Sequence, residues 1–251
     1  MSRKLEITSE DIEYFNRQKE LAYRGRSGEM RRKFCTDYIK TKNTVFDKLY
    51  RQLTGMIEER GEEITCHKGC STCCVLYIEA SVNECELIVY YLYENMDVFF
   101  IFLEQYPEWR RRIGQYGDPL IDCEMTIAEM RREDRWDDDS QFKLDRKLID
   151  YQFLNVPCPF LHDDICIIHA VRPYACANHL VTSPSDWCSP FHPARPVLYR
   201  GDKWEEMNDL TLYGYQLERA VIASMPRTVY EILRGGLPYI SEITGIELPE
   251  D

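Results

Sequence analysis

The chain has 251 residues, which is enough for one large domain or two small ones with a buried core. Hydrophobic residues make up 44% of it and charged residues 29%, as in ordinary globular proteins. The formal net charge of −12 excludes a general nucleic-acid-binding protein, because such proteins need a basic surface for phosphate contacts.

No targeting or membrane segment is recognisable. Residues 1–11 are charged and contain no apolar stretch of the kind found in signal peptides. The most apolar stretch, residues 85–103, contains several charged residues, so we expect no membrane span. The eleven cysteines then indicate a reducing compartment in which thiols stay free, and we expect a cytoplasmic protein.

The first hundred residues are predicted to be mainly helical. Thr8-Ser9-Glu10-Asp11 is typical of a helix N-terminus, and Gly25 and Gly28 are expected to interrupt the helical pattern after it. Residues 29–60 are predicted to form a helix that Gly61 ends, because apolar residues recur there at helical spacing. This region also contains a basic group that is typical of a solvated helix face: Arg24, Arg26, Arg31, Arg32 and Lys33.

The middle of the chain is predicted to be helical with interruptions. Ser81-Val82-Asn83-Glu84 has the capping-box pattern and is expected to open a helix with an apolar stripe. Pro107 and residues 114–119 are expected to break the helical pattern before another helix over residues 126–135.

Further helices are predicted on either side of residues 158–188, a stretch that is rich in cysteine. Asp137-Asp138-Asp139 is expected to form a solvated turn that caps a helix over residues 141–152. Apolar residues between Trp204 and Ile222 predict a helix that ends near Pro226, and a shorter helix is expected to end at Gly235-Gly236. The predicted fold class is therefore mostly α: a helical single domain with irregular cysteine-rich metal-binding loops.

Three segments are expected within that domain: an N-terminal helical segment (1–61), a cysteine-cluster core (62–190) and a C-terminal helical segment (191–251) that packs on the core. Three cysteines lie outside the two cysteine-rich stretches, which are residues 66–74 and 158–188. Cys35 and Cys85 are expected to be buried core residues, and Cys123 is expected to lie in a loop.

The first cysteine-rich stretch, Cys66-His67-Lys68-Gly69-Cys70-Ser71-Thr72-Cys73-Cys74, contains four thiols in nine residues. Thiolates are soft ligands, and three or four must converge on one ion or cluster, whereas core packing requires no such density. Gly69 favours a wrapped loop over a regular helix. The side chains of Cys73 and Cys74 are expected to diverge, so we expect them to serve different metals or different edges of one site.

The second stretch begins about ninety residues later and contains Cys158, Cys166, Cys176 and Cys188. A proline follows Cys158, and Cys-Pro recurs around iron–sulfur clusters. Asp163-Asp164 is expected to form a turn that brings Cys158 and Cys166 together. All five histidines lie in or beside the two stretches, and we expect one or two of them to bind metal or support its ligands: His67, His162, His169, His179 and His192.

The order of these motifs resembles the YkgJ-type cysteine-cluster family, described as a zinc- or iron-chelating domain that includes flagellin lysine-N-methylases. The similar motifs are the first stretch, then Cys158-Pro159-Phe160-Leu161, then Cys166-Ile167-Ile168, Arg172-Pro173 and Cys176, within residues 65–188. The resemblance implies that Arg172 donates to a cluster sulfur or to a substrate. It implies a metal-ligand set of Cys66, Cys70, Cys73, Cys74, Cys158, Cys166, Cys176 and Cys188.

The chain departs from the family pattern in two places. Ile168-His169 stand where the family has a tyrosine, and Ala177-Asn178 stand where an arginine commonly follows the last motif cysteine. If the missing residues take part in the methylase reaction, this chain does something else.

The motifs support three functional hypotheses. The first is a metalloprotein with an iron–sulfur cluster, of the 4Fe–4S type, or zinc; the resemblance then implies a methyltransferase-like or redox enzyme, with methyl transfer from S-adenosylmethionine to a lysine of a partner protein. The second is a non-catalytic module in which zinc stabilises loops for protein interaction or metal handling. The third is a radical S-adenosylmethionine enzyme, which shares the C-x3-C-x2-C spacing but needs βα repeats that the sequence lacks.

Overall fold

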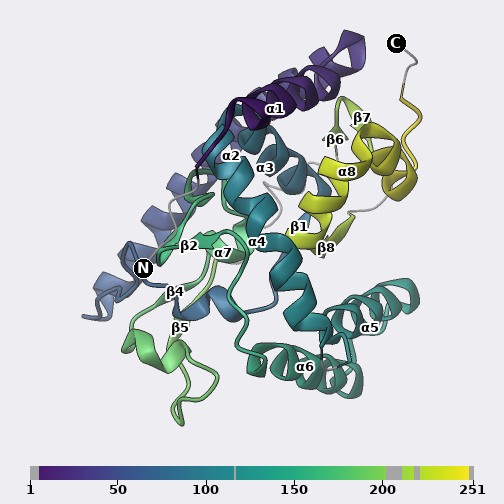
Figure 1. The fold of residues 1–251 in the computed structure, drawn as a ribbon. Helices are drawn as coiled ribbons and strands as arrows, with labels where there is room; N and C mark the ends of the chain where they lie inside the picture. The colour runs from purple at the N-terminus through teal and green to yellow at the C-terminus, as the bar shows by residue number, and fades with distance from the viewer. Residues whose placement is uncertain (1–5, 116, 202–210, 218–220, 249–251) are drawn as a thin grey trace.

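The computed structural model describes residues 6–115, 117–201, 211–217 and 221–248. Within these ranges the chain is mostly helical, which confirms the predicted fold class at that level (Figure 1). The helices are α1 (Ser9–Ala22), α2 (Gly25–Glu59), α3 (Val82–Glu94), α4 (Met96–Gly114), α5 (Pro119–Glu133), α6 (Asp138–Phe153), α7 (Tyr174–Ala177) and α8 (Met225–Thr244).

The described strands form four small antiparallel sheets of two strands each. The pairs are β1 (Glu79–Ser81) with β8 (Ile222–Ser224), β2 (Leu161–His162) with β3 (Ile165–Cys166), β4 (Leu180–Val181) with β5 (Leu198–Tyr199), and β6 (Thr211–Leu212) with β7 (Tyr215–Gln216). Three short 3-10 helices complete the cysteine-rich region: η1 (Thr72–Val75), η2 (His169–Val171) and η3 (Ser185–Cys188).

The helix starts follow the predicted caps. Thr8 caps α1 in a reciprocal capping box with Asp11, and Ser81 caps α3 in the same way with Glu84. Asp137 caps α6 through its side chain, so the acidic run acts as the predicted helix start.

The main core contains α3, which packs on α2, α4 and α8. Ile88, Val89 and Leu92 of α3 are fully buried there, together with Cys85, as expected. The same cluster includes residues from Phe15 to Ile246, so all three parts of the chain contribute to one core.

The basic group at the start of α2 is only partly solvated. Arg31 is buried and forms a bidentate ion pair with the buried Glu86, at 2.6 Å from Nε to Oε1 and 2.8 Å from Nη2 to Oε2. Arg31 therefore links α2 to α3 instead of contributing to an exposed basic patch.

The predicted break at residues 114–119 is confirmed, since α4 ends at Gly114 and α5 begins at Pro119, but two other predictions are wrong. Pro107 lies inside α4, where Phe102, Tyr106 and Trp109 bury one face of the helix and outweigh the lost backbone hydrogen bond. Cys123 is fully buried within α5 and not in a loop, because α5 starts at Pro119 behind an Asp118 cap.

The predicted helix before Pro226 is also wrong over the described residues. Trp204 lies outside them, but residues 211–217 contain the β6–β7 hairpin and residues 222–224 form β8. Helix α8 starts at Met225, and a kink at Gly236 (φ 57°, ψ −145°) interrupts it near the predicted end before it continues to Thr244.

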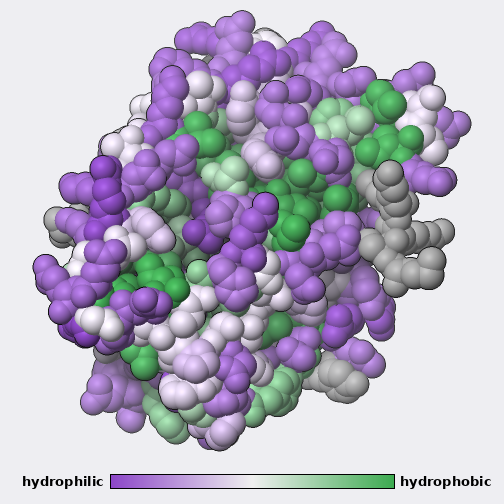
Figure 2. Space-filling model, turned by 90° about the vertical axis from the view of Figure 1, so that its left-hand side faces the viewer, coloured by the Kyte–Doolittle hydropathy of each residue, from purple (hydrophilic) through white to green (hydrophobic). Residues whose placement is uncertain are grey.

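No helix in the described part of the chain is long and apolar enough to cross a membrane. On the face seen in Figure 2, hydrophobic side chains lie in separate patches between polar ones.

Candidate metal centre

The two cysteine-rich stretches meet in space. The backbone N–H of Cys158 donates to the carbonyl of Cys74 (2.8 Å), and η1 of the first stretch packs against η3 of the second. Residues far apart in the sequence are therefore neighbours, and all eight cysteines expected to bind metal lie on the segments that meet here.

The first stretch is a wrapped loop that is held by the edge of β4. Thr65 donates from its backbone to the Val181 carbonyl (2.8 Å) and from its hydroxyl to the Ser183 carbonyl (2.6 Å). Gly69 adopts φ +90°, in the region that favours glycine, and the Cys70 N–H donates to the His67 carbonyl (3.0 Å). The expectation of a loop in place of a regular helix is confirmed.

The neighbouring thiols of Cys73 and Cys74 shift each other's pKa. A hydrogen bond with the Cys74 side chain lowers the pKa of Cys73 to about 7, against the opposing effect of burial, and the charge of Arg172 lowers it further. The same hydrogen bond raises the pKa of Cys74. Cys73 is therefore the more acidic thiol of this adjacent pair.

The second stretch begins with a hairpin that has the predicted turn. Asp163 and Asp164 both have positive φ (49° and 59°), as a two-residue turn with right-handed strand twist requires, and Leu161 pairs with Cys166. Before the hairpin, Phe160 stacks on Phe102 of α4 with ring centroids 4.3 Å apart, which fixes the exit of the chain from Cys158.

The turn that carries Arg172 and Cys176 is fixed from two sides by buried charged residues. The Lys42 ammonium of α2 donates to the Arg172 carbonyl, and the Glu84 carboxylate of α3 accepts from the Tyr174 N–H (2.7 Å). Burial lowers the pKa of Lys42 to about 8, while the Glu84 charge opposes that shift. The sequence indicates Glu84 only as part of a capping box and gives no sign of Lys42, because a lysine at helical spacing resembles a solvated one.

Electrostatic effects place the remaining thiols in the same neighbourhood. Burial, followed by the charges of Cys158, Cys73 and Cys166, raises the pKa of Cys176. Burial also raises the pKa of Cys188 to about 11, and the charges of Cys73, Cys66 and Cys70 add to it. Cys73 thus lies within electrostatic range of thiols from both stretches.

The thiols do not surround a common point. Within the described residues, no three His, Cys, Asp or Glu side chains form a group that could hold a metal ion. The backbone brings the cysteines into one region, and binding of an ion there would require their side chains to rotate toward it.

The histidines have separate environments. His67 Nδ1 lies 2.9 Å from the Thr65 carbonyl, His162 Nδ1 lies 2.9 Å from the Gln105 amide group, and His192 stacks on Trp187. Burial lowers the pKa of His179 to about 4, and the charge of Arg200 contributes. His179 is therefore neutral at pH 7, and its carbonyl accepts a weak hydrogen bond from the Cys66 thiol (3.8 Å).

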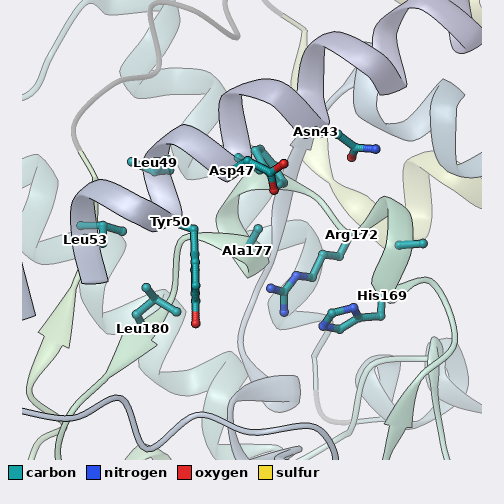
Figure 3. Close-up of a pocket in the computed structure, with 11 residues that line it drawn as sticks. Asn43, Asp47, Leu49, Tyr50, Leu53, His169, Arg172, Ala177 and Leu180 are labelled. Atoms are coloured by element: carbon teal, nitrogen blue, oxygen red, sulfur yellow. The ribbon is translucent and has the colours of Figure 1, made fainter. Parts of the chain in front are cut away.

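A cavity of about 280 Å³ lies between α2 and the segment from His169 to Leu180, which carries Cys176. Figure 3 shows the Arg172 side chain extending into this cavity next to His169, with Tyr50, Leu53 and Leu180 on the opposite side. Arg172 lines this cavity, and its charge also lowers the pKa values of the Cys66 and Cys166 thiols against the larger effect of burial.

The two departures from the family pattern have structural roles. His169 lines the cavity, whereas Asn178 is buried and holds the Gly201 backbone at both its N–H (2.7 Å) and its carbonyl (3.1 Å). Asn178 thus fastens the segment after β5 to the end of α7.

No protein-family model, curated protein or solved structure matches the chain. The resemblance to the cysteine-cluster family therefore depends on the spaced motifs alone.

Proposed function

We propose that the chain is a metalloprotein in which the eight cysteines of the two stretches hold an iron–sulfur cluster, with zinc as the alternative. The meeting of the two stretches at the Cys158–Cys74 hydrogen bond supports this proposal most. Eight thiols exceed the needs of one tetrahedral zinc site, and Cys158-Pro159 is a pattern that recurs at iron–sulfur clusters. Two zinc sites would also use eight thiols, so metal analysis must distinguish iron from zinc.

The donor set fits either group chemically. All eleven cysteines are free thiols. A lowered pKa, as at Cys73, makes the thiolate ligand available at neutral pH, and bound metal would deprotonate the remaining thiols. When bound, a cluster would supply electron transfer or a Lewis-acidic iron, and zinc would cross-link the loops. The need for free thiols also supports a cytoplasmic location.

The alternative function, a zinc-stabilised interaction or metal-handling module, is favoured by the shortness of the elements that carry the cysteines. The longest of them, η1, α7 and η3, have four residues each, and β3 has two. Segments this short form few hydrogen bonds within themselves, and metal would then supply much of the free energy that holds them in place. Methyl transfer from S-adenosylmethionine to a protein lysine is a third proposal, carried by the family resemblance.

Anaerobic purification followed by analysis of iron, zinc and acid-labile sulfide tests the proposal. We expect iron with sulfide and absorption at about 400 nm from thiolate-to-iron charge transfer; a colourless protein with zinc would favour the interaction module. Protein that takes up neither metal, even after reconstitution, would overturn both.

Single substitutions then locate the site. Cys73→Ser and Cys158→Ser, one in each stretch, should both lose most of the metal, because each stretch supplies ligands. Cys123→Ala is the matched control, since Cys123 is a buried thiol in α5 outside both stretches and should leave the metal content unchanged. Comparison of Cys73→Ser with Cys74→Ser asks whether the hydrogen-bonded pair serves one metal or two.

A further inference from the structure

The cavity between α2 and the Arg172 turn has a cationic end and an apolar wall. Arg172 and His169 come from the cysteine-rich side, and Phe46, Tyr50 and Leu53 come from α2. We propose that this cavity binds a small aromatic anion, a carboxylate or a phosphate ester, whose charged group contacts Arg172. The inference deepens the proposed function, since it names the class of molecule that would bind against the turn that carries Arg172 and Cys176.

The Arg172 guanidinium is available for a ligand. The Arg172 carbonyl is held by Lys42, but within the described part of the chain the guanidinium forms no hydrogen bond or ion pair with the protein. The side chain is half-buried and extends into the cavity (Figure 3). The backbone of Arg172 is fixed, and the N–H groups of its planar guanidinium are free to donate. Such a group suits a carboxylate or phosphate, which accepts two hydrogen bonds from arginine.

A neighbouring histidine adds to the preference for an anion. His169 lies beside Arg172 in the cavity (Figure 3), and burial, then the charges of Arg172 and Lys68, lower its pKa. His169 is therefore neutral at pH 7 and can donate one N–H to an oxygen of the ligand. Arg172 supplies the positive charge of the cavity lining.

The opposite wall suits an aromatic ring. Tyr50 is 52% exposed, and its ring faces the cavity from α2, with Leu180 below it (Figure 3). Phe46 lines the same wall. An aromatic ring gains from offset or edge contacts with such side chains, and the volume of about 280 Å³ is at the small end of ligand pockets.

Asp47 sets the orientation of the ligand. Its carboxylate lies on the α2 side of the cavity, across from the Arg172 turn (Figure 3). It repels a negative charge placed near α2, so the charged end of the ligand should lie at Arg172 and an uncharged end at Asp47.

Calorimetric titration of the purified full chain, with metal content measured on the same sample, tests the inference. The probes are benzoate, phenyl phosphate and the neutral phenol. We expect both anions to bind and phenol to bind at least about tenfold more weakly. The anion that binds with the higher affinity shows whether the ligand is a carboxylate or a phosphate ester. Failure of both anions to bind, or equal affinity for phenol, would overturn the inference.

Variants identify the contacts. Arg172→Gln should weaken anion binding about tenfold or more, with no effect on phenol, because it removes a charged donor. Tyr50→Ala should weaken anions and phenol alike by about threefold to tenfold, and Asp47→Asn should strengthen anions only. Arg195→Gln and Tyr14→Ala are matched controls on exposed residues outside the cavity and should change nothing.

The same measurements separate the two proposals. Anion binding by protein that takes up no metal would overturn the metal proposal and leave the cavity inference standing. If Arg172→Gln also loses metal, the loss of metal could itself explain weaker anion binding. Tyr50→Ala and Asp47→Asn then test the cavity inference, because Tyr50 and Asp47 lie on the wall away from the cysteine-rich segments. Unchanged anion affinity in both Tyr50→Ala and Asp47→Asn would then overturn the inference.

Discussion

Among the described residues, four charged side chains are buried in the core, and each has a defined partner. Arg31 pairs with Glu86, Lys42 donates to the Arg172 carbonyl, and Glu84 accepts from the Tyr174 N–H. Removal of one partner leaves a buried polar group without its hydrogen bond, which costs more than the net value of the bond itself. These residues therefore fix α2, α3 and the cysteine-bearing turn relative to one another.

Replacement of Lys42 should loosen the Arg172 turn. Lys42→Met keeps the apolar stem but leaves the Arg172 carbonyl without its donor, so we expect the free energy of unfolding to fall by about 1–3 kcal/mol. Urea unfolding measures this change. Lys40→Met, at an exposed position of the same helix, should change it by less than about 0.5 kcal/mol. Equal effects of the two substitutions would contradict the anchoring role.

Glu124 should make stability depend on pH. Burial raises the pKa of Glu124 above its ordinary value, although Arg227 opposes the shift. The folded state therefore binds this proton more tightly than the unfolded state, and the contribution of Glu124 to stability falls as pH rises from the ordinary value to the raised one.

Accordingly, Glu124→Gln should gain stability relative to the unsubstituted protein as pH rises from about 4 to about 7. Urea unfolding of both proteins at the two pH values gives the difference. Glu129→Gln, at an exposed position of the same helix, isolates the effect of burial. A difference that is constant with pH, or that shrinks, would contradict the assignment.

At the scale of elements, the corner between α1 and α2 depends on a close backbone approach. A Cβ at Gly28 would lie 2.1 Å from the Tyr23 carbonyl carbon, whereas a Cβ at Gly55 in the same helix would meet nothing within 4 Å. Packing between the ends of the two helices therefore requires Gly28. The expectation that Gly28 interrupts the helix is wrong, since α2 runs through it.

This contrast gives opposite effects for two similar substitutions. Gly28→Ala should destabilise the protein by about 1–3 kcal/mol through overpacking. Gly55→Ala should stabilise it by up to about 1 kcal/mol, because alanine is the better helix former. Thermal unfolding of both variants tests the pair, and a Gly28→Ala protein as stable as Gly55→Ala would contradict the close approach.

Elements with their own local signals could be predicted from the sequence. The Ser81–Glu84 capping box and the regular apolar spacing of α2 fix those helices at short range. Helix α4 continues through Pro107 because tertiary packing outweighs one lost hydrogen bond, and β8 forms only because β1 provides its partner. Neither contact is visible in the local sequence.

The candidate site was predictable only in part for the same reason. Cysteine spacing identified the segments that meet, and Asp163-Asp164 identified their turn. The cavity requires α2 to pass beside η2 and Arg172. The face of a long helix on which the Arg172 turn packs is set by long-range contacts and could not be predicted from local sequence.

At the scale of the whole molecule, the C-terminal elements complete the core. Strand β8 pairs with β1, and α8 packs on α3 with Val229 and Ile232 buried. A chain that ends at Leu217 should therefore lose its cooperative unfolding transition, since it exposes the buried face of α3. Circular dichroism during urea titration measures this, with the full chain as control; a sharp transition in the shortened chain would show that the core forms without α8.

The Cys158–Cys74 hydrogen bond has a consequence for biosynthesis. The four thiols of the first stretch leave the ribosome before their partners are made, and at ordinary elongation rates the interval is on the order of ten seconds. During that time the nascent chain holds these sulfurs without the neighbours that shield them in the finished fold. The first stretch is then exposed to oxidants and chaperones without its partner. The yield of protein with all its thiols reduced therefore depends on protection of the first stretch during translation.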